Sequence, residues 1–226
     1  MPEIAENLKV VRERIAAAAR LSGRRTEQIT LVAVTKTVGV PEIREALEAG
    51  VTDIGENYVQ EAIDKRLEIG SGPRWHMIGH LQRNKAKHAV EVFDLVQSVD
   101  SVEVARELGK RSLAAGKTMD VLVEVNVSGE ESKFGVEPPE ALSLASRIAE
   151  VEGVRVQGLM GMAPFLDNAE ETRPYFAALK AIWDRLPGDQ RSFLSMGMTQ
   201  DFEVAIEEGA NMVRVGTAIF GPRRAG

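Results

Sequence analysis

Near its start the sequence reads Leu31-Val32-Ala33-Val34-Thr35-Lys36. A short run of apolar and β-branched residues favours a buried strand, and this one ends in a lysine. Comparable runs recur along the chain, and the strands that they predict span residues 31–36, 53–55, 75–79, 95–99, 121–126, 156–160, 192–195 and 212–215. Segments with helical spacing separate them. Eight strands that alternate with helices predict a parallel sheet closed into a single (β/α)8 barrel, the TIM barrel, over residues 1–226.

Helix signals support this alternation. An opening helix over residues 3–21 is predicted by apolar residues at helical spacing, namely Ile4, Leu8, Val11 and Ile15. Pro41 stands where a first helical position is expected. Asp100 and Glu103 have the spacing of a capping box, with Asp100 as the N-cap. The competing architecture, an open doubly wound sheet, usually has a Gly-rich turn after its first strand, and residues 35–39 do not form such a turn.

The composition fits one globular domain, because hydrophobic residues make up 44% of the 226 positions and charged residues 27%. The net charge of −6 argues against a nucleic-acid partner, since such proteins usually carry a basic excess. There is no cysteine, which excludes disulfides and thiolate chemistry. No apolar run approaches the roughly 18 residues of a membrane span, and the acidic N-terminus lacks the apolar core of a signal peptide. We expect a cytoplasmic protein without a membrane partner.

Lys36 is the first candidate for chemistry. Functional groups of (β/α)8 barrels project from the carboxyl ends of the strands, and Lys36 ends the first predicted strand. Alternation along that strand places it on the same face as Val32 and Val34, which we expect to be the barrel interior. Burial disfavours the ammonium form, and a neutral amine can attack an aldehyde to form an imine. The alternative is a lysine at the end of a strand that extends to water.

The loops after the last two strands predict a phosphate site. Arg214, between Val213 and Val215, faces the opposite side of its strand from both, again the expected interior. A buried arginine needs an acceptor, which is either a carboxylate such as Glu124 or Glu56, or a ligand. Gly216-Thr217 follows at once and suits a phosphate at the start of a short helix. Residues 195–199, after the seventh strand, form a second glycine turn with hydroxyls, and the loops at these two places commonly bind phosphate in this fold.

Taken together, these stretches closely resemble the pyridoxal phosphate homeostasis protein family. The resemblance covers nearly the whole chain and no motif position departs from it. The segments that carry it are Val32-Ala33-Val34-Thr35-Lys36 and residues 53–61, 75–85, 128–135, 158–162, 194–198 and 213–221.

The resemblance implies a fold type III barrel like the N-terminal domain of alanine racemase, with pyridoxal 5′-phosphate (PLP) as a Schiff base on Lys36. It further implies that Arg214 meets the pyridine nitrogen, while Ser195, Gly216 and Thr217 hold the phosphate. Asn57 and Met77 would lie near the ring. Lys133, which would otherwise be interpreted as an exposed loop residue, would lie near the phenolic oxygen. No catalytic residue is assigned.

Family members are regulators of vitamin B6 and amino-acid balance without an established reaction, so the resemblance implies a PLP carrier that hands the cofactor to PLP-dependent apo-enzymes. Arginine cannot take up a pyridinium proton, which leaves the ring a poorer electron sink. The acid/base tyrosine that racemases bring from a second domain is expected to be absent. Two alternatives remain open: a racemase-like enzyme that uses Tyr58, and a sugar-phosphate aldolase that uses Lys36 without PLP.

Two further expectations concern metals and assembly. His76 and His80 are four residues apart, but this metal-ligand spacing converges on a helix, and here the segment is a predicted strand. We therefore expect no metal site. No additional apolar face is evident, which favours a monomer.

Overall fold

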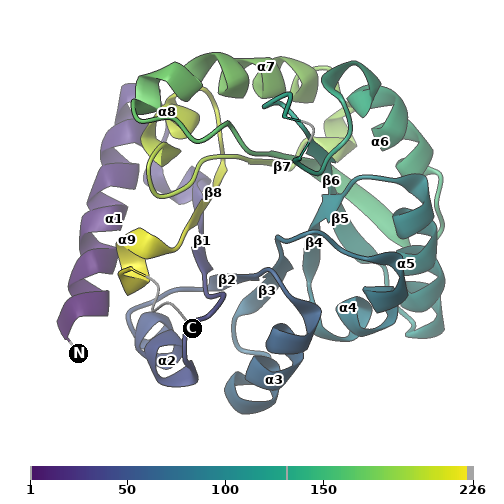
Figure 1. Cartoon of the computed structure of the whole chain (residues 1–226), viewed down its shortest axis with the longest axis horizontal. Helices are drawn as coiled ribbons and strands as arrows, with labels where there is room; N and C mark the ends of the chain where they lie inside the picture. Colours follow the sequence, from purple (N-terminus) through teal and green to yellow (C-terminus); the bar gives the residue numbers. More distant parts are fainter. Residues whose placement is uncertain (1, 131, 223–226) are drawn as a thin grey trace.

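The structure is a computed structural model that describes residues 2–130 and 132–222. Eight parallel strands close into one barrel, each paired with the next and β8 with β1 (Figure 1). The predicted (β/α)8 barrel is therefore confirmed. The strands are β1 (Thr30–Val34), β2 (Asp53–Glu56), β3 (Arg74–Met77), β4 (Leu95–Val99), β5 (Met119–Val125), β6 (Val154–Gly161), β7 (Phe193–Ser195) and β8 (Met212–Val215).

Helices surround the barrel (Figure 1). They are α1 (Pro2–Leu21), α2 (Val40–Glu48), α3 (Val59–Ile69), α4 (Ala86–Val92), α5 (Val102–Ala114), α6 (Ala141–Ala149), α7 (Arg173–Trp183), α8 (Phe202–Glu207) and α9 (Thr217–Phe220). Short 3₁₀ turns add η1 (Thr26–Gln28), η2 (Arg83–Lys85), η3 (Pro138–Glu140), η4 (Ala169–Thr172) and η5 (Gly188–Gln190). The apolar stripe that predicts α1 is buried, and α1 packs against α8 and α9.

Two local expectations need correction. The helix after β4 is capped by Ser101, whose hydroxyl accepts a hydrogen bond from the Val104 N–H at 3.4 Å, and not by Asp100. The Asp100 carboxylate faces His80 instead, at 3.4 Å. Strand β1 ends at Val34, so Lys36 lies in the loop beyond it.

An apolar cluster fills part of the barrel interior. Its fully buried side chains are Val32, Leu95, Leu122, Met160 and Met212. Further toward the carboxyl ends of the strands, Val34 lines a cavity. Val32 and Val34 thus lie where the alternation of β1 predicts. At the carboxyl ends of the strands a ligand-sized cavity thus lies above a packed core.

Strand β6 lies tightly against β7 at Gly158, which pairs with Phe193. On its other side Gly158 pairs with Leu122, next to a shift in the β5–β6 register. Gly158 has a φ of 149°, and a Cβ placed there would lie 1.8 Å from the Phe193 carbonyl oxygen. Only glycine fits this contact, because both the backbone conformation and the available space exclude a side chain.

We therefore predict that Gly158→Ala lowers the free energy of unfolding by at least about 2 kcal/mol. Gly72→Ala is the matched control, because no atom lies within 4 Å of a Cβ at Gly72. That substitution should change stability by less than about 0.5 kcal/mol. Urea unfolding followed by circular dichroism measures both. Equal unfolding midpoints for the two variants would contradict the described β6–β7 contact.

Candidate functional site

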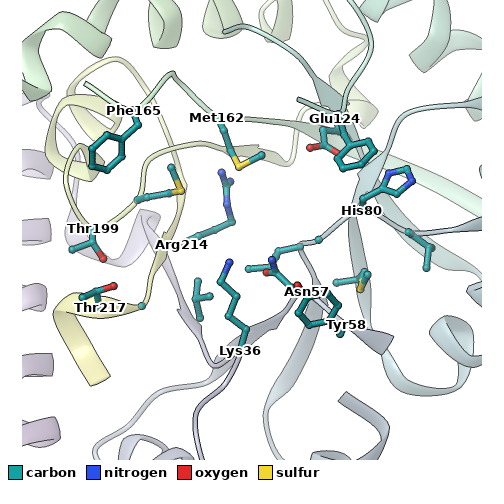
Figure 2. A pocket seen from close by; sticks show the side chains of 18 of the residues that line it. Lys36, Asn57, Tyr58, His80, Glu124, Met162, Phe165, Thr199, Arg214 and Thr217 are labelled. Carbon is teal, nitrogen blue, oxygen red and sulfur yellow. The ribbon is translucent and has the colours of Figure 1, made fainter. Parts of the chain in front are cut away.

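A cavity of about 950 Å³ opens at the carboxyl ends of the strands. Residues from the ends of β1, β2, β3, β5 and β8, and from the loops after β6 and β7, line it. Its volume lies near the upper end of the range of roughly 300–1,000 Å³ typical of small-molecule sites. In Figure 2 the Lys36 side chain points toward Arg214, whose guanidinium extends away from Lys36 and toward Met162.

Hydrogen bonds on both sides of Lys36 hold its loop in place. The Thr35 hydroxyl donates to Glu56 Oε1 at 2.6 Å, and the Thr37 N–H donates to Glu61 Oε1 at 2.6 Å. Thr37 has a φ of 61°, a conformation that a threonine adopts only where its surroundings impose it. The half-buried Lys36 side chain therefore enters the cavity from a well-defined backbone.

A buried lysine completes this anchor. Lys65 on α3 is 7% exposed, and its ammonium donates to the Thr35 carbonyl at 2.6 Å. The same ammonium bonds Glu56 Oε1 at 2.7 Å and Glu61 Oε1 at 2.6 Å. We call these four residues the Lys65 cluster. Because the charges are paired and hydrogen-bonded, the cluster can remain buried, and it ties the end of β1 to β2 and α3.

Arg214 places a buried guanidinium at the cavity. Its side chain is 4% exposed, and it donates to the Ser195 hydroxyl at 2.5 Å and to the Gly161 carbonyl at 3.0 Å. Burial lowers the pKa of Arg214 to about 10, which leaves the guanidinium charged at neutral pH. Of the two carboxylates considered from the sequence, Glu56 belongs to the Lys65 cluster, whereas Glu124 lies near enough to act on Arg214 electrostatically.

Hydroxyl groups line another side of the cavity. Thr199, after β7, and Thr217, at the start of α9, both line it and lie on the same side (Figure 2). The Ala218 N–H donates to the Thr199 hydroxyl at 3.4 Å, which joins the two loops. Gly216 lies against Val34 on β1 and also lines the cavity.

Glu124, at the end of β5, lines the cavity on the side away from the two threonines (Figure 2). The side chain is 3% exposed, and its Oε2 atom has no hydrogen-bond partner among the described residues. Burial raises the pKa of Glu124 to about 7, with a further contribution from the negative charge of Asp100 that Arg214 partly offsets. Near neutral pH this carboxyl group therefore gains or loses a proton readily.

Aromatic side chains surround the mouth. Tyr58 is 63% exposed and Phe165 is 74% exposed, and both line the cavity. Phe134 stacks on His80, with the ring centroids 3.8 Å apart. His76, by contrast, lies fully buried in the barrel, where it bonds Asp53 at 2.9 Å. Over residues 2–130 and 132–222, no three His, Asp or Glu side chains are grouped so that they could hold a metal ion.

The structure brings together six of the eight predicted cofactor-binding residues. Those that line the cavity are Lys36, Asn57, Met77, Arg214, Gly216 and Thr217. Ser195 lies beneath Arg214, fully buried, and its hydroxyl also donates to Gln97 at 2.6 Å. Lys133 is exposed and outside the lining, which its neighbour Phe134 joins instead. The roles of all eight residues toward a cofactor remain predictions.

Sequence reasoning did not place two residues of the cavity wall, Thr199 and Glu124, in the site. Thr199 stands in the same glycine turn as Ser195, so the turn itself was the available signal. Glu124 was considered only as an acceptor for Arg214. Residues two apart on a strand share a face, and Glu124 stands two residues after Leu122, an interior residue. This spacing was the signal that could have placed Glu124 in the cavity wall.

Comparisons with known proteins agree with this geometry. A family model described as the N-terminal domain of alanine racemase matches residues 3–224. The pyridoxal phosphate homeostasis protein of Aquifex aeolicus is 43% identical over 226 residues, which cover 97% of this chain and 98% of that protein. This chain belongs to the pyridoxal phosphate homeostasis protein family.

Solved structures extend this comparison. PipY of Synechococcus elongatus, whose crystal structure has PLP bound, is 34% identical with a TM-score of 0.83, and the match covers 96% of this chain and all of PipY. Alanine racemase of Clostridium difficile shares the fold alone, with a TM-score of 0.76 at 17% identity, and this chain matches 58% of its length. No helix in the described part of this homeostasis family member is long and apolar enough to cross a membrane.

Because the pKa of Glu124 is raised, the free energy of unfolding should depend on pH. Between pH 4.5, the usual pKa of a glutamate, and about pH 7, Glu124 holds a proton in the folded homeostasis protein that it releases in the unfolded chain. The free energy of unfolding therefore falls as pH rises through this window. Relative to Glu124→Gln, the wild type should lose on the order of 3 kcal/mol of unfolding free energy between pH 4.5 and 8. Urea unfolding at several pH values measures the difference, and a difference independent of pH would refute the raised pKa.

Proposed function

We propose that this protein binds PLP in the cavity, linked as an imine to Lys36, and serves in the cell's PLP homeostasis as a carrier. Membership of the family supports this proposal, as does the PLP bound to PipY. The observation that carries it for this chain is the convergence of Lys36, Arg214 and two threonine hydroxyls on one cavity. We propose further that it acts as a cytoplasmic monomer.

The chemistry of the lining fits the parts of PLP. The cofactor has an aldehyde, an anionic phosphate, a ring nitrogen and a flat ring. Lys36 offers an amine for the aldehyde, and Arg214 offers N–H donors for the ring nitrogen. Thr199 and Thr217 offer hydroxyl donors for the phosphate. Met77 and Met162 offer apolar contacts for the ring. In this proposal Thr199, rather than the buried Ser195, is the phosphate ligand of the β7 loop.

Each of this chain's residues then has a limited task. Lys36 would hold PLP through its amine, which would bond to the aldehyde carbon while the carbonyl oxygen would leave as water. When bound, PLP supplies a carbonyl carbon that reacts reversibly with amines. Arg214 presents only donors and cannot receive a proton, so it favours an unprotonated ring nitrogen opposite it. An unprotonated ring withdraws electrons poorly, which favours carriage of PLP over catalysis on amino acids.

A racemase-like enzyme is the alternative function, and Tyr58 is the residue that favours it because it lines the cavity. Its side chain is 63% exposed, however, which leaves its hydroxyl open to water. A tyrosine that acts as an acid/base group needs a fixed position close to the reacting carbon. This exposure favours the carrier over the enzyme.

The experiment that separates these functions uses the PLP-loaded protein. We predict that chiral chromatography shows no racemisation of any L-amino acid above the rate with free PLP. We also predict that PLP passes to the apo-form of a PLP-dependent enzyme, measured as recovered activity. Robust turnover of an amino acid would contradict the carrier proposal. If Tyr58→Phe then abolished turnover while PLP remained bound, the racemase-like alternative would be supported.

The proposed phosphate contacts can be tested by comparing two ligands. Thr199→Val and Thr217→Val should each weaken PLP binding by about tenfold, the expected loss for one hydrogen bond to a charged group. Pyridoxal, which has no phosphate, should bind both variants within about twofold of the wild type. Thr118→Val, an exposed position just before β5, is the control. Equal losses for PLP and pyridoxal would show that the threonines do not contact the phosphate.

A further inference from the structure

A chain of buried polar side chains crosses the barrel interior. It connects Asp53 at the start of β2, through His76, Gln97 and Ser195, to Arg214 at the cavity. Each link is a hydrogen bond: Asp53 Oδ1 to His76 Nε2 at 2.9 Å, His76 Nδ1 to Gln97 Nε2 at 2.9 Å, Gln97 Oε1 to Ser195 Oγ at 2.6 Å, and Ser195 Oγ to Arg214 Nη1 at 2.5 Å. All five residues are at most 9% exposed. We call them the interior relay.

The chemistry of the partners fixes the direction of these bonds at Gln97. The Gln97 side chain lies 3.2 Å from Met212 Sδ, and a thioether sulfur accepts hydrogen bonds but cannot donate them. The amide nitrogen, rather than the oxygen, must therefore face Met212 and with it His76. His76 Nδ1 is then an acceptor, which leaves the proton on Nε2 to donate to Asp53. Burial lowers the pKa of His76, in keeping with this neutral ring.

The bond to Arg214 has the same direction. A guanidinium only donates, so Ser195 accepts from Arg214 and gives its single proton to Gln97 Oε1. All four hydrogen bonds thus run one way, from the cation at the cavity to the carboxylate at the other end of the barrel. Although burial acts to raise the pKa of Asp53, hydrogen bonds from His76 and Thr52 bring it below its usual value. The relay therefore ends on a charged carboxylate.

Most of the relay lies away from the cavity. Among its members only Arg214 lines the cavity, and Asp53 is the first residue of β2, at the opposite end of the strands. Five buried polar groups cost more than the apolar side chains that fill the rest of the interior, unless each is hydrogen-bonded. Hydrogen bonds in such a chain polarise one another, so a change at one end is felt at the other.

We propose that the interior relay positions Arg214, with Asp53, His76, Gln97 and Ser195 as positioning residues that hold its guanidinium toward the bound ligand. The inference rests on the proposed function, because only the proposed function places a ligand beside the Arg214 guanidinium. It also states a property of the ligand-free protein, namely that the guanidinium is immobilised through a carboxylate on the far side of the barrel.

Asp53→Asn tests the relay from the end farthest from the ligand, because it removes the charge and keeps the shape. Asp120→Asn is the matched control: Asp120 lies near the start of β5, has a 17% exposed side chain against 13% for Asp53, and pairs with Arg155 and Arg74, neither of which belongs to the relay. In ligand-free protein, the Arg214 side-chain N–H groups should exchange with solvent at least about tenfold faster in Asp53→Asn, as measured by NMR. In Asp120→Asn the rate should stay within about twofold of wild type.

The PLP-bound protein gives a second readout that a purely structural role would not move. Asp53→Asn should shift upward the pH midpoint of the bound cofactor's absorption band, since a loosened Arg214 no longer opposes protonation of the ring nitrogen. Gln97→Leu, which cuts the relay at its centre, should show the same shift and weaken PLP binding by about tenfold or more.

The outcomes separate this inference from the proposed function. Equal Arg214 exchange in Asp53→Asn, Asp120→Asn and wild type would overturn the relay, whether or not PLP binds. Unchanged band midpoints in both relay variants would also overturn it. Failure of the wild type to bind PLP, with Arg214 exchange still dependent on Asp53, would contradict the proposed function and leave the relay's hold on the guanidinium established.

Discussion

The burial of the Arg214 guanidinium inside the barrel is the constraint on which the rest of the site depends. A charge in this position would be prohibitively costly without acceptors, and the Ser195 hydroxyl and Gly161 carbonyl supply them from β7 and β6. With two of its N–H groups bonded in this way, the guanidinium remains charged beside the cavity. This end of the barrel thereby favours an anionic ligand.

The position of Lys36 is controlled from outside the barrel. Lys36 takes its position from a loop that the Lys65 cluster ties to β2 and α3. Breaking a buried ion pair of this kind leaves an uncompensated charge, so the loop is held more firmly than an ordinary surface turn. Arg214 and Lys36 thus reach one cavity from two independent supports, and the proposed binding site depends on their convergence.

Periodicity made much of this predictable. Alternation along β1 and β8 placed Lys36 and Arg214 toward the interior, and the eight apolar runs indicated the barrel. Contacts between distant strands could not be predicted in this way. Gly197, with a φ of 91° and no room for a side chain against Ala205, turns the chain after β7, so Thr199 reaches the cavity while Ser195 stays below it. Similarly, Asp100 pairs with His80 rather than capping α5, a choice set by tertiary packing.

The most direct test of the central claim is borohydride reduction of the PLP-loaded protein, followed by proteolysis and peptide mass spectrometry. The account predicts that the visible absorption band disappears and that a pyridoxyl adduct is found on Lys36, with no adduct in Lys36→Arg. An adduct confined to another lysine, or a protein that stays colourless and takes up no added PLP, would contradict it.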